Sequence, residues 1–371
     1  MFFFKKITEL FKIFSFKFGY WIILPILRIW LNGPMYLYGI TFKNYGTFCH
    51  DSKPFNHMIN LKRGIKYGME KYEYIDILTP TEGKVNDIPI IYLHGGGWVC
   101  VKNEHLIHSL AALSRAGNCI YVVEYPKSPE NTFPSALISV LKACNFLKKN
   151  KGYKKISFMG DSAGGNLATL AAAILTNNEL MKIFQNDLKD KVLYSEMPDI
   201  DRIVSIYGIL DYQSWKNTWT SFILYFCYSC YLPKSIRKNY KITSLCDIDY
   251  KYLNNYPETL LICGKQDGLL YSSRLAKKRL TKANCQCKLL EYPGVHGFYG
   301  IPIQWTNGYW KQNTLPATEE IISFFNKKNF KLSNKDVPFD WTLPFWIFLS
   351  INYPLYLIFQ FVLYKLNLLD I

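Results

Sequence analysis

The sequence lacks the charge patterns of a nucleic-acid-binding protein. Its formal net charge is +16, but the lysines and arginines are dispersed, without blocks of like charge and without a recognition-helix or zinc-finger pattern. A general basic bias of this kind is usually surface character, so we expect no nucleic-acid partner. The chain also has no N-x-S/T sequon, which argues against a glycosylated exterior surface.

A metal-ligand pattern is also missing, although the chain has ten cysteines. Cys227 and Cys230 form a CxxC motif, and Cys285 and Cys287 form a CxC motif, but no histidine lies near either pair. A structural zinc ion needs a complete set of thiolate and imidazole ligands, so we predict no metal site. Disulfide frameworks are typical of short secreted chains, and we expect scattered, mostly buried thiols instead.

The N-terminal end of the chain is apolar and aromatic. Residues 2–18 place apolar side chains at helical spacing beside several lysines, which predicts a basic amphipathic helix suited to a membrane interface. Residues 19–40 are apolar but are interrupted by two prolines, an asparagine and Arg28, so no clean run is long enough to span a bilayer. We therefore assign residues 1–42 to a membrane-associating segment.

The C-terminal end has a similar character. The stretch from Trp341 to Tyr364 contains no charged residue and is long enough to span a bilayer. Pro344 and Pro354 favour a kinked transmembrane helix or a re-entrant hairpin over residues 338–366; two buried helices packed on the domain are the alternative. We expect a protein attached to the endoplasmic reticulum or another internal membrane, and the sequence leaves open which side the domain faces.

Between the two ends, short apolar segments rich in β-branched residues alternate with amphipathic or alanine-rich segments. This alternation is typical of a mostly parallel sheet with helices on both faces, and it predicts one α/β domain over residues 43–330. The predicted strands are residues 88–94, 119–125, 155–160, 202–208, 259–264 and 287–292, and the predicted helices are about 104–117, 134–150, 163–176 and 270–283.

One serine lies in an unusual glycine-rich setting. The stretch ISFMGDSAGGNLATLAAAIL, residues 156–175, places Ser162 between Gly160 and Gly164, where a strand must reverse sharply into a helix. Side chains two residues before and after the serine would collide with the neighbouring strand and helix. Because a serine that projects from such a turn is typical of a nucleophile, we predict that role for Ser162.

A serine hydroxyl needs a general base, usually a histidine that a carboxylate holds. The chain has six histidines, and only His296 follows Ser162, in the order that a strand–turn–helix scaffold requires. Asp267 is the predicted acid, because it follows an apolar strand at the edge where open α/β sheets gather ligand groups. Asp211 is the competing acid, and we interpret it as a loop or cap residue.

Acyl transfer also needs donors for the negative charge of its tetrahedral intermediate. In YLHGGGW, residues 92–98, a strand leads into three glycines whose N–H groups can face a substrate oxygen. We predict Gly96 and Gly97, together with the N–H of Ala163, as the oxyanion donors. His94 is expected to brace the glycine loop through hydrogen bonds.

The two glycine-rich motifs resemble those of the hormone-sensitive-lipase-like esterases, α/β-hydrolases that include the arylacetamide deacetylases and steryl acetyl hydrolases. The segment VVEYPKSPENTFPSAL, residues 122–137, is similar to the strand–loop–helix segment of that family, although Lys127 and its neighbours depart from it. The resemblance spans about residues 85–325. Its motifs are HGGGW and GDSAGGN, whose supporting residues are His94, Gly95, Gly160, Asp161 and Gly164.

The resemblance implies an α/β-hydrolase fold with a helical cap and a triad of Ser162, Asp267 and His296, without a metal or an organic cofactor. It implies a serine carboxylesterase or lipase that hydrolyses apolar esters, such as an acetylated sterol or an acylglycerol, through an acyl-enzyme on Ser162. Two alternatives stay open: amide or acetyl-group removal by the same triad, and a non-catalytic fold that binds a small ligand. The cap is expected at about residues 209–250, where the apolar run 219–232 either lines the substrate pocket or forms an ordinary buried helix.

Overall fold

The computed structural model describes residues 24–25, 28, 59–103, 110–185, 197–214, 221–299 and 315–331. The strands are β1 (Ile59–Lys66), β2 (Tyr74–Pro80), β3 (Ile90–Leu93), β4 (Ile120–Val123), β5 (Lys155–Asp161), β6 (Asp199–Ile206), β7 (Glu258–Gly264) and β8 (Cys287–Tyr292). The α-helices are α2 (Ala111–Arg115), α3 (Ser135–Lys151), α4 (Ala163–Thr176), α5 (Asn178–Gln185), α6 (Ser221–Tyr231), α7 (Lys234–Asn239), α8 (Leu270–Lys282) and α10 (Leu315–Asn326). Short 3-10 helices cover Leu245–Asp247 and Tyr250–Tyr252.

The strands form one eight-stranded sheet in the order β1-β2-β4-β3-β5-β6-β7-β8. β2 is antiparallel to β1 and to β4, whereas the remaining neighbours are parallel to each other. The carboxyl ends of β3, β5 and β7 therefore lie at the same edge of the sheet. This topology confirms the predicted α/β-hydrolase fold with a mostly parallel central sheet.

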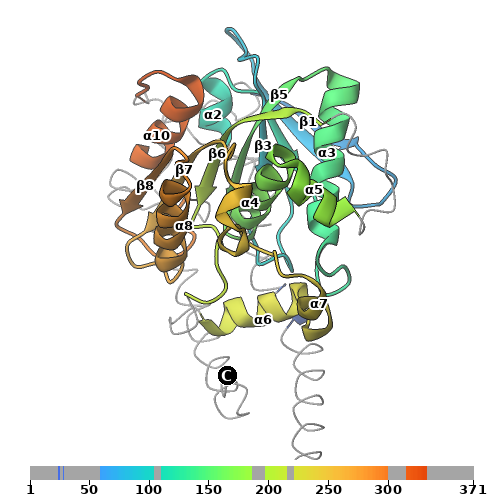
Figure 1. Cartoon of the computed structure of the whole chain (residues 1–371). Helices are drawn as coiled ribbons and strands as arrows, with labels where there is room; N and C mark the ends of the chain where they lie inside the picture. Colours follow the sequence, from blue (N-terminus) through green and yellow to red (C-terminus); the bar gives the residue numbers. More distant parts are fainter. Residues whose placement is uncertain are drawn as a thin grey trace, which may run out of the picture.

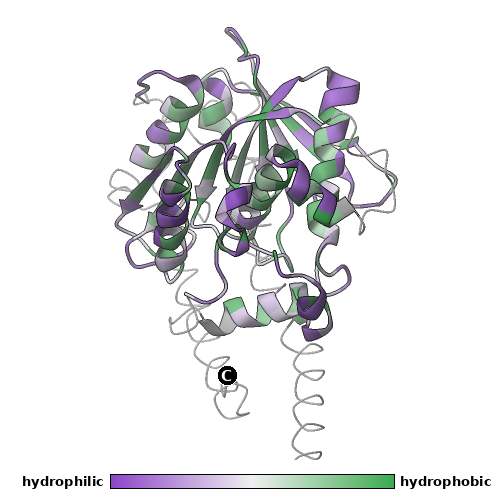
Figure 2. Cartoon of the chain, in the orientation of Figure 1, coloured by the Kyte–Doolittle hydropathy of each residue, from purple (hydrophilic) through white to green (hydrophobic). Residues whose placement is uncertain are grey.

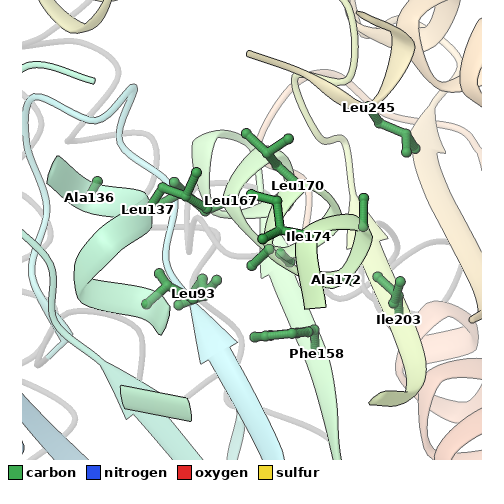
Figure 3. Packing of buried hydrophobic residues seen from close by; sticks show 14 of the residues in the cluster. Leu93, Ala136, Leu137, Phe158, Leu167, Leu170, Ala172, Ile174, Ile203 and Leu245 are labelled. Atoms are coloured by element: carbon green, nitrogen blue, oxygen red, sulfur yellow. The ribbon is translucent and has the colours of Figure 1, made fainter. Parts of the chain in front are cut away.

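Helices cover both faces of the sheet and produce two apolar cores. α3, α4, α5 and α8 pack on one face, and α2 and α10 pack on the other (Figure 1). Within the first core, Leu93, Phe158 and Ile203 lie on three neighbouring strands beside α4 (Figure 3). The central strands are mostly apolar, and hydrophilic residues lie toward the outer sides of the helices (Figure 2). A parallel sheet buried on both faces produces this pattern.

Helix α4 is the central helix of the first core. Its residues from Ala163 to Ile174 are all buried, and it packs against both β5 and β6. Alanine and glycine dominate its sequence, AGGNLATLAAAILT, and their small side chains let the helix approach the sheet closely. This close packing fixes the start of α4, which directly follows Ser162.

Two parts of the domain differ from the sequence-based prediction. β1 and β2 were not predicted. β1 (INLKRGIK) is an edge strand whose positions are mostly exposed and include three basic residues, so it lacks an apolar run. β2 (YIDILTP) is largely buried, but Asp76 interrupts its apolar residues. No helix was predicted over residues 178–185, whereas α5 forms there and buries Leu180 and Phe184 in the first core. Of the predicted helix 104–117, residues 104–109 lie outside the described residues.

The predicted membrane-associating segments lie almost entirely outside the described residues. Only Leu24, Pro25 and Arg28 of residues 1–42, and no residue of 338–366, are described. Among the helices that the structure does describe, none is long and apolar enough to cross a membrane. α6 and α7 fall within the predicted cap range and lie together at one end of the molecule (Figure 1).

Candidate active site

Ser162 occupies a strained turn between β5 and α4. Its φ is 51° and its ψ is −118°, a conformation that non-glycine residues rarely adopt. A Cβ on Gly160 would lie 2.4 Å from the carbonyl oxygen of Gly164, and a Cβ on Gly164 would lie 1.9 Å from that of Leu93. The glycines on both sides of the serine are therefore required by close backbone approach, as their spacing predicted.

The structure brings the three predicted catalytic residues together from three loops. Ser162 Oγ lies 3.0 Å from Nε2 of His296, and Nδ1 of His296 lies 2.9 Å from Oδ2 of Asp267. Ser162 and Asp267 are buried, while the imidazole of His296 keeps 26% of its surface exposed. A substrate can therefore reach the imidazole of His296, whereas the carboxylate of Asp267 is shielded.

The charge state of His296 depends on Asp267. Burial disfavours the imidazolium, but the charge and hydrogen bond of the Asp267 carboxylate outweigh burial and raise the pKa of His296 above its ordinary value. An imidazole with a raised pKa is a stronger base toward a nearby hydroxyl. The carboxylate thus both orients the ring and stabilises the charge that the ring gains when it takes a proton.

Asp267 is held by the turn that follows β7. Its Oδ1 accepts a hydrogen bond of 2.8 Å from the N–H of Leu269, so its other oxygen is left to face His296. Asp211, the competing acid, accepts hydrogen bonds from the N–H groups of Gln213 and Ser214. It therefore serves a local turn, as interpreted from the sequence.

The glycine loop after β3 faces the same edge of the sheet as Ser162. Gly96 and Gly97 have φ values of 101° and 60°, which favour glycine. Among the described residues, the N–H groups of Gly96 and Gly97 donate no hydrogen bond. Ala163 is the first residue of α4, so its N–H has no acceptor within the helix. Within the described part of the chain, none of the three predicted donors has a protein acceptor, so each can donate to a ligand oxygen.

The cap helix α6 contacts this loop directly. A Cβ on Gly97 would lie 2.6 Å from Sγ of Cys227, and Trp98 stacks on Tyr231 with 4.3 Å between ring centroids and 3° between ring planes. Trp98 and Tyr231 are fully buried. Most described side chains of α6 are thus buried, and this helix packs against the predicted oxyanion loop.

Asp161 connects the two glycine motifs. It is buried and accepts hydrogen bonds of 2.6 Å from the Tyr92 hydroxyl and 2.8 Å from the N–H of Gly95. Burial raises the pKa of this carboxyl group. A Cβ on Gly95 would lie 2.4 Å from its Oδ2, so Gly95 has to be glycine for the loop to approach Asp161.

His94 belongs to a buried polar network that the sequence only partly predicted. Its Nδ1 lies 2.7 Å from the carbonyl oxygen of Gly95, its ring stacks on Tyr125, and Lys127 Nζ lies 3.1 Å from its Nε2. Lys127 also donates to Glu124. Burial opposes the charge of Glu124, but Lys127 and His94 lower the pKa of this carboxyl group below its ordinary value. The expected bracing by His94 is therefore observed.

Glu124, Tyr125 and Lys127 were missed as supporting residues of the site. Tyr125 donates a hydrogen bond of 2.6 Å to the carbonyl oxygen of His94. The signal available in the sequence was their place at the carboxyl end of the predicted strand 119–125, where Glu124 and Tyr125 are its last residues and Lys127 follows it, at the edge of the sheet where ligand groups gather. Lys127 departs from the family pattern, and here its ammonium group fills the space between Glu124 and His94.

The assembled site has the parts of a nucleophilic acyl-transfer centre. The Ser162 hydroxyl can pass its proton to His296 as its oxygen attacks a carbonyl carbon, and the loop N–H groups can bind the resulting oxyanion. Among the residues that the structure describes, no group of three or more histidine, cysteine, aspartate or glutamate side chains could hold a metal ion. The nine described cysteines are free thiols.

A comparison with protein families assigns the chain. Residues 90–300 match the family described as having the alpha/beta hydrolase fold. The chain belongs to the α/β-hydrolase family. This match covers the strand–glycine junctions and the segments that hold Ser162, Asp267 and His296, and it confirms the resemblance that the glycine motifs indicated.

Proteins similar in sequence to the chain include several esterases. A probable carboxylesterase 6 of Arabidopsis thaliana is 34% identical over 115 residues, which cover 28% of this chain and 34% of that protein. A kynurenine formamidase of Scheffersomyces stipitis is 29% identical over 180 residues, which cover 47% of this chain and 62% of that protein. The chain thus spans less than two thirds of the length of these curated relatives.

A hormone-sensitive lipase from a metagenome library has a similar structure. Its TM-score is 0.56 at 20% sequence identity, and the alignment covers 72% of this chain and 86% of that chain. At this level of identity the likeness shows the fold.

Proposed function

We propose that this α/β-hydrolase is a serine carboxylesterase that hydrolyses apolar carboxylic esters through an acyl-enzyme on Ser162. The observation that supports it is the continuous contact of Ser162 Oγ, His296 and Asp267, over 3.0 Å and 2.9 Å. It lies at a strained turn beside the N–H groups of Gly96, Gly97 and Ala163, which have no acceptor among the residues that the structure describes. The sequence similarity to a probable carboxylesterase supports the same reaction class.

The reaction proceeds in two steps. His296 takes the proton of Ser162 as the serine oxygen bonds to the ester carbonyl carbon, and the N–H groups of Gly96, Gly97 and Ala163 bind the oxyanion. When the carbon–oxygen bond of the ester breaks, the alcohol leaves with the proton that His296 returns. Water, deprotonated by His296, then attacks the acyl-enzyme, and the acid leaves as Ser162 recovers its proton.

A fluorophosphonate probe tests this proposal directly. We expect the purified protein to be labelled on Ser162 and Ser162→Ala to remain unlabelled. His296→Ala should fold normally but lose turnover of a p-nitrophenyl ester. A folded wild-type protein that is not labelled, or equal labelling of Ser162→Ala, would contradict the proposal and favour a non-catalytic ligand-binding fold.

Hydrolysis of amide-type bonds is the second candidate reaction. The kynurenine formamidase similarity supports it, because the same triad can also attack an amide carbonyl carbon. The two candidates differ in kcat/KM for matched substrates with the same acetyl group, phenyl acetate and acetanilide. A higher value for the anilide would overturn the ester proposal and leave the triad in place.

The cap supports an apolar substrate. α6 has the sequence SFILYFCYSCY, without a charged residue, and its Cys227 lies against Gly97 at the reaction site. A series of p-nitrophenyl esters of increasing acyl length measures how much chain the pocket accepts. We expect kcat/KM to be higher for short and medium acyl chains than for a charged acyl group such as succinyl.

We also propose that the protein associates with an internal membrane, such as the endoplasmic reticulum, where lipophilic esters gather. The aromatic, charge-poor segments 1–42 and 338–366 support this proposal. The full chain is expected to pellet with membranes and to be partly released when residues 336–371 are deleted. A full chain that remains in the supernatant at low and high salt would contradict it.

A further inference from the structure

Arg28, one of the three described residues of the N-terminal region, contacts the loop that carries the predicted oxyanion glycines. Its Nε donates a hydrogen bond of 2.9 Å to the carbonyl oxygen of Val99. Its Nη1 and Nη2 donate to Oε1 and Oε2 of Glu130 at 2.8 Å and 2.7 Å, and Nη2 also donates to the carbonyl oxygen of Ser128 at 3.0 Å. One guanidinium group thus joins the N-terminal region, the glycine loop and the turn at 128–130.

The segment that Arg28 binds is strained. Trp98 and Val101 have φ values of 61° and 69°, in the left-handed region that bulky and β-branched residues avoid. Such conformations persist only where surrounding contacts hold them. The N–H groups of Val99 and Cys100 donate to the carbonyl oxygen of Gly96 at 3.1 Å, so the strained turn is continuous with the predicted oxyanion glycines.

Two successive carbonyl groups of this turn are held from outside. The N–H of Ser128 donates to the carbonyl oxygen of Trp98 at 2.8 Å, and Arg28 binds the carbonyl oxygen of Val99. Arg28 also binds Ser128 and Glu130, so the two groups that bind these carbonyl oxygens, the N–H of Ser128 and the Arg28 guanidinium, are connected to each other. The loop therefore has a fixed outer side, while the N–H groups of Gly96 and Gly97 remain free of protein acceptors among the described residues.

The contacts of Arg28 favour a role in positioning the glycine loop over a role in stabilising the fold. The side chains of Arg28 and Glu130 keep 30% and 56% of their surface exposed, and ion pairs this exposed contribute about 0–1 kcal/mol to folding. A displacement of about 1 Å in a catalytic group costs about 100-fold in rate. The same contact can therefore be nearly neutral for stability and large for catalysis.

We propose that Arg28 is a positioning residue that holds the Trp98–Val99 turn so that the N–H groups of Gly96 and Gly97 face the carbonyl oxygen of the substrate. This inference rests on the proposed esterase function. Arg28 acts through the loop and does not touch the reacting atoms.

Kinetics of Arg28→Ala test the proposal against a matched control. We expect kcat for a p-nitrophenyl ester to fall about 10- to 100-fold, with KM changed less than about twofold, because the oxyanion is bound only as it forms. Arg202→Ala is the control, since Arg202 also donates to a carbonyl group, that of Phe324, and pairs with a glutamate, Glu258. Arg202 lies at the amino end of β6, opposite the reaction site, so kcat should not change.

A charge exchange separates the ion pair from the loop contact. Arg28→Glu combined with Glu130→Arg keeps a pair of opposite charges but leaves no donor for the carbonyl oxygen of Val99. We expect this double variant to regain the melting temperature of the wild type without regaining kcat. Arg28→Lys keeps one donor group and should lose less kcat than Arg28→Ala, which provides a test if the alanine variant does not fold.

Three outcomes would overturn the inference. Arg28→Ala could keep wild-type kcat, it could lose kcat only in proportion to a loss that Arg202→Ala shows as well, or the charge exchange could restore full kcat. A failure of the proposed function is distinguishable, because the wild-type protein itself would then fold without hydrolysing any ester and without fluorophosphonate labelling.

Discussion

At the scale of single residues, His296 sets the pH range in which Ser162 can react. Its imidazole must be neutral to take the proton of the serine, and Asp267 raises its pKa. Protonation at lower pH therefore removes the base. We expect kcat/KM to fall as the pH drops through a value above the ordinary histidine pKa of about 6.5 and to level off at higher pH.

Asp267→Asn is the variant that checks the cause of this shift. It removes the charge that raises the pKa of His296, so the acid limb of the kcat/KM profile should move to lower pH. The plateau should fall about 10⁴-fold, because the ring loses its orientation and the stabilisation of its charge. A profile measured between about pH 5 and 9 with a p-nitrophenyl ester provides the comparison. An unshifted acid limb would assign the pKa shift to another group.

A comparison of alanine variants at Gly97 and Gly64 separates an effect on the oxyanion loop from the effect of backbone strain alone. Both have left-handed φ values, 60° and 68°, but a Cβ on Gly97 would strike Cys227 at 2.6 Å, whereas a Cβ on Gly64 meets nothing within 4 Å. Gly97→Ala should lower kcat about 100- to 1000-fold. Gly64→Ala should cost only about 1 kcal/mol of unfolding free energy and leave kcat unchanged. Equal kcat values for the two variants would remove Gly97 from the oxyanion site.

At the scale of elements, α4 is tied to the cap region by one asparagine. Asn166 is buried, and its Nδ2 donates to the carbonyl oxygens of Ile209 and Thr243 at 3.0 Å and 3.1 Å. Asn166→Asp would point a carboxylate at these carbonyl groups and should cost about 3 kcal/mol or more of unfolding free energy at neutral pH. The folded-state pKa of this new carboxyl group would be raised, so the loss should diminish as the pH falls toward about 4.

A second asparagine provides the matched control. Oδ1 of Asn177 accepts hydrogen bonds from the N–H groups of Glu179 and Leu180, both at 3.0 Å, at the start of α5. Aspartate serves equally well at such a position, so Asn177→Asp should change the unfolding free energy by less than about 0.5 kcal/mol. Urea denaturation of both variants measures the difference. A similar loss in both would show that the Asn166 contacts do not depend on its amide group.

The strands that the sequence predicted well are those whose burial on both faces of the sheet produces a continuous apolar run. β3, β5 and β7 are buried on both faces, so each is an apolar run that ends in a glycine-rich turn. β1 lies at the sheet edge with exposed, charged positions, and nothing in its residue types distinguishes it from a loop. Local pattern therefore predicts the strands with an apolar run, including β8 at the other edge of the sheet, and misses β1; β2 was also missed, although it is largely buried.

At the scale of the whole molecule, the site combines residues that are far apart in the sequence. His296 was predictable because it is the one histidine after Ser162. The contact of Arg28 with Val99 joins residues separated by 71 positions, and no pattern of residue types indicates it. Catalytic residues that occur in a fixed order along the chain can be predicted from the sequence, whereas supporting contacts that depend on tertiary packing cannot.

The N-terminal region is expected to contribute to catalysis as well as to membrane attachment. Deletion of residues 1–42 removes Arg28, and it also removes Leu24, which is buried in the same core as Cys227 of α6. We expect this deletion to lower kcat on a water-soluble ester at least as much as Arg28→Ala does. Deletion of residues 1–20 keeps both side chains and should retain kcat. Equal kcat for the two shortened chains would contradict this prediction.

The stack of Trp98 on Tyr231 has a consequence for how the protein discriminates among ligands by size. A bulky acyl chain that pushes α6 outward must also pull on the loop that carries Gly97, since the helix and the loop share this aromatic contact. Steric crowding of the acyl chain against α6 then lowers kcat, with little loss of affinity for the ester. An oversized ester would bind tightly but be hydrolysed slowly, so it would act as a competitive inhibitor of the hydrolysis of smaller esters.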